Sequence, residues 1–344
     1  MDQDKLNDLI QHQAYLYRLS SSEVVTLLKQ FDKSSNNMLS TLRDLLDDLT
    51  DAEKTALMAG QYTTSNLKDI RQLMQNWQDS LGTVLLDGFA VSATALAVYE
   101  AKYIAQNFSD NVIKSSGSQL YDKAKKQPLT GGSLLDSLLD DIAGDARKKV
   151  ESVIRDAINQ GQTNQQMIKR IKGTKALNYQ DGILEQSRSS INMVVRTARS
   201  HVANVTYTET FKALGAQYFK FVSVLDSRTS KVCASLDGTI WKVGDPNIRK
   251  PPLHPHCRSI LVGVDESGET IGQRPSNNGT DIKTVDSNTS FKEWFAKQDE
   301  VFQKNWLGPA RYKLYNDGKY TLDKFVDPLS GQTFTLKEME ALDK

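Results

Sequence analysis

Apolar residues in the first half of the chain recur at the three- and four-residue spacing of helices that bury one face. This pattern begins at Val24, runs through Trp77, and is followed by the most apolar stretch of the chain, Val84–Ile104. No proline occurs before Pro128, so no residue in this half obliges a helix to break. We therefore expect a helical N-terminal region over residues 1–127.

The pattern continues after a Gly-rich interruption and then changes its period. Helical spacing resumes with Ser133 as the expected N-cap and lasts until Gly215, where a helix C′ glycine belongs. Alternating apolar residues then predict strands near 219–225, 239–243 and 259–264. The sequence thus predicts an α+β fold, in which a mostly helical N-terminal half precedes a small α+β module with short antiparallel strands, at residues 134–264.

The last part of the chain has two different compositions. Residues 265–290 are rich in Gly, Ser, Asn and Thr, so we interpret them as a linker or long surface loop. Capping-box patterns at Ser290 and Thr335 indicate helices, the first of which we expect to continue through Trp306. Residues 291–344 are therefore predicted to form a short helical C-terminal tail.

Composition narrows the class of protein. The 344 residues carry 43 Lys+Arg against 42 Asp+Glu, and this balance argues against a strongly basic nucleic-acid coat. Two cysteines exclude a disulfide-rich secreted scaffold. The apolar stretch contains Asp87, Glu100 and Lys102, which makes it a poor membrane span. The acidic N-terminus lacks the order of a signal peptide, so we expect a protein made in a reducing cytoplasm.

One short region concentrates the residues with distinctive chemistry. Both cysteines and two of the four histidines lie in two segments close together in the sequence: Cys233, His254, His256 and Cys257. The prolines at 251, 252 and 255 fix φ and hold the second segment extended. Thiolates and imidazoles are preferred ligands of tetrahedral zinc, so these four residues are candidate ligands of a structural zinc ion. The alternatives are a Cys233–Cys257 disulfide, or cysteines that are simply buried in the core.

These segments belong to a longer series of motifs. In chain order the series is Arg196-Thr197, Gly215, Asp226-x-Arg228-Thr229, Cys233, Leu236-Asp237-Gly238 and Pro251-Pro252-x-His254-Pro255-x-Cys257-Arg258. It resembles the head morphogenesis domain of the phage Mu F-like minor head proteins of tailed phages, in order and in spacing. The resemblance spans Gln162 to Val264. We assign a structural role to ten of its residues: Arg196, Asp226, Arg228, Thr229, Asp237, Gly238, Pro251, Pro252, Pro255 and Arg258.

The resemblance implies a structural protein rather than an enzyme. It implies a minor capsid protein bound to the portal vertex inside the head, acting in head assembly, DNA packaging or DNA exit. The implied partners are the portal protein, the major capsid or scaffolding protein, and DNA, with no membrane span. The implied location is the virion, after assembly in the host cytoplasm.

The chain departs from the family pattern at two positions that concern zinc. Many members have cysteine where this chain has Ser230 and Ser259, and those cysteines would complete a CxxC…CxC set. A serine hydroxyl is a poor zinc ligand. Whether His254 and His256 compensate is a hypothesis that the sequence leaves open.

An enzyme is the competing interpretation. The candidates are a metal-dependent hydrolase or nuclease, or an ADP-ribosyltransferase-like effector in which Arg196 and Glu209 form a catalytic set. No P-loop, dinucleotide fingerprint, nucleophile elbow or HExxH motif is present. We call the segment that contains Pro251, Pro252 and Pro255 the proline loop. Only ~80 residues follow it, which is small for an independent catalytic domain. We expect the charges near Arg196 and Glu209 to bond to neighbouring turns instead.

A basic segment lies inside this otherwise neutral chain. Its cations are Arg147, Lys148, Lys149, Arg155, Lys169, Arg170, Lys172 and Lys175. They are candidate DNA contacts, because phosphate binding depends mainly on charge. A solvated helical face is the favoured alternative, and the scarcity of aromatic residues argues against single-strand binding.

Overall fold

A computed structural model describes residues 5–108, 116–327 and 330–342. Internal contacts divide the chain into two compact units, and each unit is discontinuous in sequence. The helical unit comprises Ser20–Ala93 and Ser133–Arg196, and the sheet unit comprises Met1–Leu19, Thr94–Gly132 and Thr197–Lys344. Three long helices, α1 (Lys5–Asp47), α3 (Ser65–Phe108) and α7 (Leu184–Ala213), contribute residues to both units.

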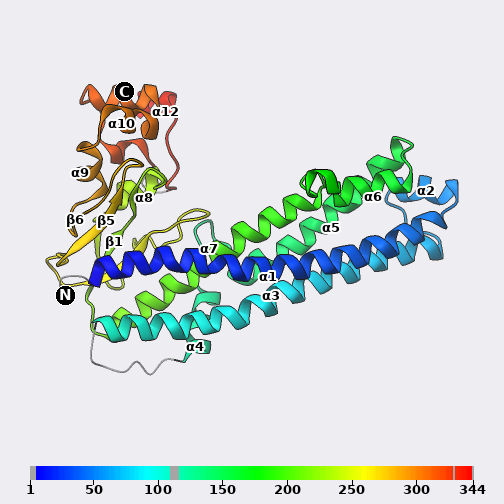
Figure 1. Cartoon of the computed structure of the whole chain (residues 1–344), viewed down its shortest axis with the longest axis horizontal. Coiled ribbons are helices and arrows are strands. Elements are labelled where there is room, and N and C mark those ends of the chain that lie inside the picture. Colours follow the sequence, from blue (N-terminus) through cyan, green and yellow to red (C-terminus); the bar gives the residue numbers. More distant parts are fainter. Residues whose placement is uncertain (1–4, 109–115, 328–329, 343–344) are drawn as a thin grey trace. The chain divides into compact units, whose positions relative to one another are not determined.

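The helical unit is built from the apolar stripes that the sequence predicts. Within it, α1 and α3 run antiparallel, since Gly88 lies against Leu27 and Ser92 donates a hydrogen bond to Glu23 (Figure 1). The short α2 (Asp51–Met58) joins them, and α5 (Leu135–Asn159), α6 (Asn164–Lys172) and a 3₁₀ turn, η1 (Lys175–Leu177), complete the unit. Burial of one face of each helix is the main source of its stability.

Polar caps fix where several helices of the two units begin. Thr50, Ser116, Thr163 and Ser290 each form a capping box with the Glu or Gln three residues later, at α2, α4 (Gly117–Lys126), α6 and α9 (Phe291–Ala296). Gly215 ends α7 with φ +91°, which confirms the predicted C′ glycine. The predicted cap at Ser133 is wrong, because the N-cap of α5 is Leu134, without a side-chain cap.

Two three-stranded sheets form the centre of the sheet unit. The first has the order β3-β1-β4, with β1 (Tyr218–Val222) antiparallel to both β3 (Ile240–Lys242) and β4 (Ile260–Val264). It packs against α7 through Tyr207 and Phe211. The second has the order β2-β5-β6, and β2 (Leu225–Asp226) pairs with β5 in parallel. The predicted α+β fold with short antiparallel strands is confirmed, with this one parallel pair added.

Residues 265–290 contain a hairpin rather than a plain linker. Strands β5 (Gln273–Asn277) and β6 (Ile282–Asp286) pair over five residues each. Their composition is polar, so the usual alternation of apolar and polar residues is missing. Arg274 is 2% exposed and takes the place of an apolar anchor in this strand.

The C-terminal helices share one aromatic core with the α+β module. The helix predicted from Ser290 to Trp306 is instead two helices, α9 and α10 (Glu300–Leu307), because Asp299 caps a new start. They are followed by α11 (Pro309–Asn316), η2 (Leu322–Phe325) and α12 (Leu336–Leu342). Phe291, Trp294 and Phe295 pack in a cluster with Leu225 and Ala234. Here Ala234 belongs to α8 (Lys231–Leu236). The domain boundaries predicted from the sequence do not coincide with the limits of the two compact units. They remain predictions.

Helix α3 contains a strongly apolar stretch. One 18-residue window has mean hydropathy 1.7, and 39% of it is buried in the protein, so length and composition alone would allow a membrane span. A buried helix of a soluble core passes the same test. The expected absence of a membrane span therefore stays a prediction.

Candidate functional site

Three of the four predicted metal ligands lie together. Ser230 is the N-cap of α8, and its side chain accepts a hydrogen bond from the backbone N–H of Cys233. The loop before β4 brings His254 and Cys257 to it, and the ligand atoms of the three residues lie within 4.8 Å of one another. His256 is exposed, with φ 59°, and lies outside this group.

The spacing within this group is close to that of a tetrahedral metal site. The two Sγ atoms are 3.6 Å apart, and Cys233 Sγ is 3.3 Å from His254 Nε2. Zinc–ligand bonds of ~2.3 Å to sulfur and ~2.0 Å to nitrogen place tetrahedral ligand atoms about 3.6 to 3.8 Å apart. The two cysteines are free thiols in this structure, and the disulfide that the sequence leaves open as an alternative is not present in it.

Ser230 occupies a fourth position beside the group. Its Oγ lies 2.8 Å from His254 Nε2. On the other side of the imidazole, Nδ1 donates a hydrogen bond to the Pro255 carbonyl over 2.8 Å, which fixes the orientation of the ring. The serine that replaces a family cysteine thus stays in the same cluster of side chains.

Burial and mutual contact separate the pKa values of the group. A hydrogen bond between the thiols, aided by His254, holds the pKa of Cys257 well below its usual range. The same contact, together with burial, raises the pKa of Cys233 well above it. Burial alone would lower the pKa of His254, but Cys257 outweighs it and raises that pKa. The lowered pKa of Cys257 favours its thiolate, which is the form that binds metals.

Asp226 joins the motif segments into one unit. Its carboxylate receives both guanidinium nitrogens of Arg258, at 2.6 and 2.7 Å, as well as the backbone N–H of Arg228 and the hydroxyl of Thr229. Burial alone would raise the pKa of Asp226, but Arg258 outweighs it and lowers that pKa. This bidentate pair clamps the end of β2 to the residue that follows Cys257.

Asp237 makes a second, deeper junction. Its carboxylate accepts from the backbone N–H of Ser223 at 2.6 Å, from the backbone N–H of Phe291 at 2.7 Å, and from Arg274 at 3.0 Å. Gly238, with φ +85°, then turns the chain toward β3. One carboxylate thus connects β1, the β5–β6 hairpin and α9.

Sequence reasoning missed two members of this cluster. Arg274 also donates to the carbonyls of Ser223 and Thr289, and Trp306 Nε1 donates to the Thr229 carbonyl over 3.0 Å. A single arginine in a polar segment carries no sequence signal for burial. The sequence places Trp306 at the end of a predicted C-terminal helix, but its spacing does not indicate which loop it contacts.

The proposed transferase-like set is not assembled. Arg196 belongs to the helical unit and donates to Asn192, Ser20 and Ser21. Glu209 forms ion pairs with Lys123 and Lys212. The contacts with Asn192 and Lys212 are to neighbouring turns of α7, as expected, whereas those with Ser20, Ser21 and Lys123 are to other helices.

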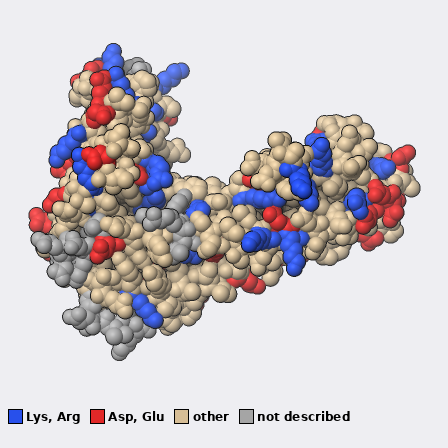
Figure 2. Space-filling model, in the orientation of Figure 1, with Lys and Arg blue, Asp and Glu red and all other residues tan. Residues whose placement is uncertain are grey.

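The basic segment is partly neutralised within the helical unit. Arg147 and Arg155 contact Glu151, Lys148 contacts Asp145, and Arg170 contacts Asp156 at 2.6 Å. Figure 2 shows Lys and Arg side chains still gathered over the region of α5 and α6. The predicted DNA contacts and the alternative of a solvated face both remain open.

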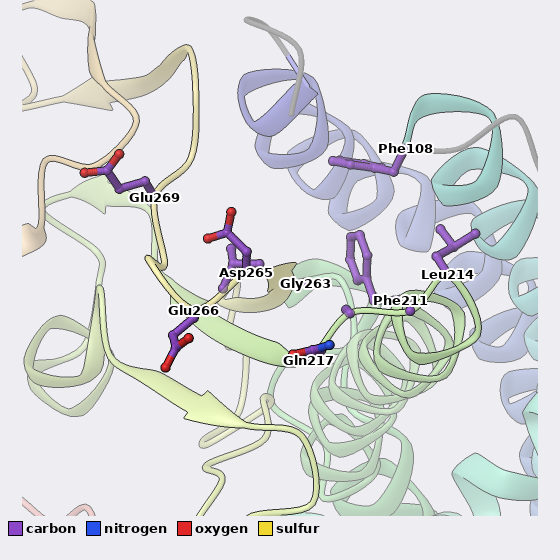
Figure 3. Close-up of a pocket in the computed structure, with 11 residues that line it drawn as sticks. Phe108, Phe211, Leu214, Gln217, Gly263, Asp265, Glu266 and Glu269 are labelled. Atoms are coloured by element: carbon purple, nitrogen blue, oxygen red, sulfur yellow. The ribbon is translucent and has the colours of Figure 1, made fainter.

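A hollow of about 580 Å³ opens beside the C-terminal end of α7. Phe108 and Phe211, whose ring centroids are 5.2 Å apart, line one side. Asp265, Glu266 and Glu269 lie on the opposite side, on the turn that follows β4 (Figure 3). The residues that line this hollow include three carboxylates and no cation among the part of the chain that is described.

Comparison with known proteins identifies one family. Residues 148–262 match the family model described as Phage Mu protein F like protein. No curated protein and no solved structure matches the chain. The match confirms the resemblance stated from the motifs, and it includes the Asp226–Arg258 clamp, Asp237 and the Cys–His group. The family is one of phage head morphogenesis proteins.

Proposed function

We propose, from the premise that residues 148–262 are phage Mu F-like, that this protein is a minor component of a phage head. In this proposal it binds the portal vertex from inside the capsid, after assembly in the host cytoplasm. Its role is in head assembly, DNA packaging or DNA exit. The observation that carries the proposal is the family match over residues 148–262. Within this segment Asp226 and Arg258 join the motif segments to one another.

The use of the motif side chains favours a structural role. Asp226, Asp237 and Arg258 are the charged groups that a catalytic site would need to leave accessible to a substrate. Each instead holds together parts of the sheet unit through several hydrogen bonds. Such contacts build a rigid docking unit, which is what a protein fixed at one vertex of a capsid requires.

Portal binding is tested with purified components. The full chain, mixed with a cognate portal oligomer and sedimented through a gradient, is expected to travel with the portal. Purified virions are expected to contain the protein, as measured by mass spectrometry. Free sedimentation of a folded chain, together with its absence from virions, would refute the proposal. The major capsid or scaffolding protein is the partner to test next in the same gradient.

DNA contact through the basic segment is a separate part of the proposal. Lys149 and Arg170 line one hollow on this surface together with Asp181 and Glu185, and Arg170 also pairs with Asp156. A gel-shift with duplex DNA is expected to show binding at low salt that fades at moderate salt. Lys149→Glu with Arg170→Glu should abolish the shift, whereas the matched exposed change Lys319→Glu should not. If no gel shift appears even at low salt, DNA is not a partner of this segment.

We also propose a structural zinc ion held by Cys233, His254 and Cys257. The donor set fits, because two sulfurs and a fixed imidazole lie at nearly tetrahedral separations. When bound, the ion would cross-link α8 to the proline loop and so supply cohesion between segments of the sheet unit. His256 takes no part in this arrangement, because it lies outside the group.

Metal analysis tests this site directly. Protein purified without chelators is expected to carry about one equivalent of zinc, as full occupancy of one structural site requires. Cys257→Ser should lose the metal, whereas His256→Ala should keep it. A metal content near zero in folded wild-type protein would refute the site.

A further inference from the structure

A second hollow in the sheet unit combines apolar walls with positive charge. Its volume is about 770 Å³. Its buried apolar lining residues are Leu129, Phe219, Leu253 and Leu261. Lys212, Arg249 and Lys250 line it as well, against a single carboxylate, Asp245, among the described residues. We call this the basic hollow, and its chemistry suits a ligand that carries both carboxylates and an aliphatic group.

The charges of the basic hollow are held close together. Burial, and then the nearby charge of Lys212, lower the pKa of Lys250. The Lys250 ammonium donates to an amide oxygen, Gln127 Oε1, at 3.4 Å. Glu209 pairs with Lys212 and offsets part of the repulsion at Lys250, and a carboxylate entering the hollow would relieve the rest.

The same unit presents a segment with the complementary composition. The acidic turn, residues 265–271, exposes Asp265, Glu266 and Glu269, and its Ile271 is 52% exposed. The Asp265 carboxylate accepts from the backbone N–H of Ser267 at 3.0 Å, so the turn has a fixed shape. Figure 3 shows the three carboxylates leaving this turn in different directions.

We propose that copies of this chain associate head to tail, the acidic turn of one copy docking in the basic hollow of the next. The acidic turn and the basic hollow of a single chain complement each other in both charge and apolar surface. Such a contact is heterologous and leaves one turn and one hollow unused, so further copies can add. A contact of this small size is weak and sensitive to salt. The proposal is independent of portal binding.

Sedimentation of the full chain tests the association. The average mass is expected to rise with protein concentration at low salt and to return to that of the monomer at high salt. A folded protein that stays monomeric at every concentration at low salt overturns the proposal, and the basic hollow would then belong to a different acidic partner.

Charge reversal tests which surfaces meet. Lys250→Glu, and separately Glu266→Lys with Glu269→Lys, should each weaken association by about tenfold or more, because each places like charges in contact. Lys242→Glu is the matched control, since Lys242 is exposed on β3 and does not line the basic hollow. Equal weakening by the control would show that net charge, not this contact, is responsible.

Mixing the two variants gives the sharpest outcome. The Lys250→Glu chain keeps a normal turn, and the Glu266→Lys/Glu269→Lys chain keeps a normal basic hollow. Together they can form the wild-type contact once, so the mixture should contain dimers but no larger species. If circular dichroism shows both variants folded and the mixture remains monomeric, the head-to-tail contact is wrong.

Discussion

The helical unit buries stripes of Leu, Ile and aromatic residues, whereas the sheet unit relies on buried polar groups at its junctions. Leu42 and Leu85 are fully buried on helices of the first unit, and their spacing alone predicts it. In the second, Asp237 and Arg274 are nearly as buried as any apolar side chain. The difference teaches that periodicity predicts a unit held by repeated apolar faces, but not one held by single carboxylates that join distant segments.

The largest expected effect concerns the buried pair of the sheet unit. Arg274→Ala leaves the Asp237 carboxylate buried without its cation, which should cost about 3–5 kcal/mol of unfolding free energy. Hydrogen exchange should rise in β5, β6 and α9 and stay unchanged in α5. Lys283→Ala, which removes an exposed ion pair with Asp281 in the same hairpin, is the control and should cost under about 1 kcal/mol. Equal costs would mean that the buried pair is not what holds the hairpin.

A cavity in the helical unit should be nearly as damaging. Leu42→Ala removes a fully buried side chain and should cost about 2–5 kcal/mol, depending on how far the site collapses. Val91→Ala, on a side chain that is 76% exposed, should be close to neutral. Loss of exchange protection is expected in α1 and α5 but not in β1. A uniform loss across both units would show that they do not differ as described.

A smaller effect depends on pH and belongs to the sheet unit. Burial lowers the pKa of His201 from 6.5, and its Nε2 donates to the Ala124 carbonyl at 2.9 Å. The neutral ring therefore contributes stability that is fully present above pH 6.5 and is lost as pH falls below it. His201→Gln keeps a donor without titrating, so its unfolding midpoint should fall less than that of wild type between neutral and mildly acidic pH. Parallel pH profiles would contradict this assignment.

The smallest effect is a helix cap. Thr163→Ala removes the side chain that accepts from Gln166 N–H at the start of α6, and it should cost about 1 kcal/mol. Thr163→Ser keeps the hydroxyl and should retain most of the stability. Chemical denaturation distinguishes the two variants, and an Ala variant as stable as the Ser variant would show that α6 is fixed by packing alone.

The limits of sequence reasoning follow from the same contrast. The long helices, Gly215 and the three central strands could be predicted because each depends on a local pattern. The site could be predicted only in part, since convergence of Cys233 with Cys257 requires knowing how α8 faces the proline loop. His256 is next to Cys257 in the sequence, but in the structure it is exposed, has φ 59° and lies outside the group. The β5–β6 hairpin was missed because its anchor is an arginine.

The discontinuity of the two units has a consequence for dissecting this protein. The helical unit consists of two chain segments, and each is bounded on both sides by residues of the sheet unit. A fragment cut at the limits of the family match, residues 148–262, would take parts of both cores and complete neither. Truncation from either terminus removes sheet-unit residues first. The family segment is thus a unit of ancestry rather than of folding, and circular permutation or internal replacement is better suited than truncation to separating its roles.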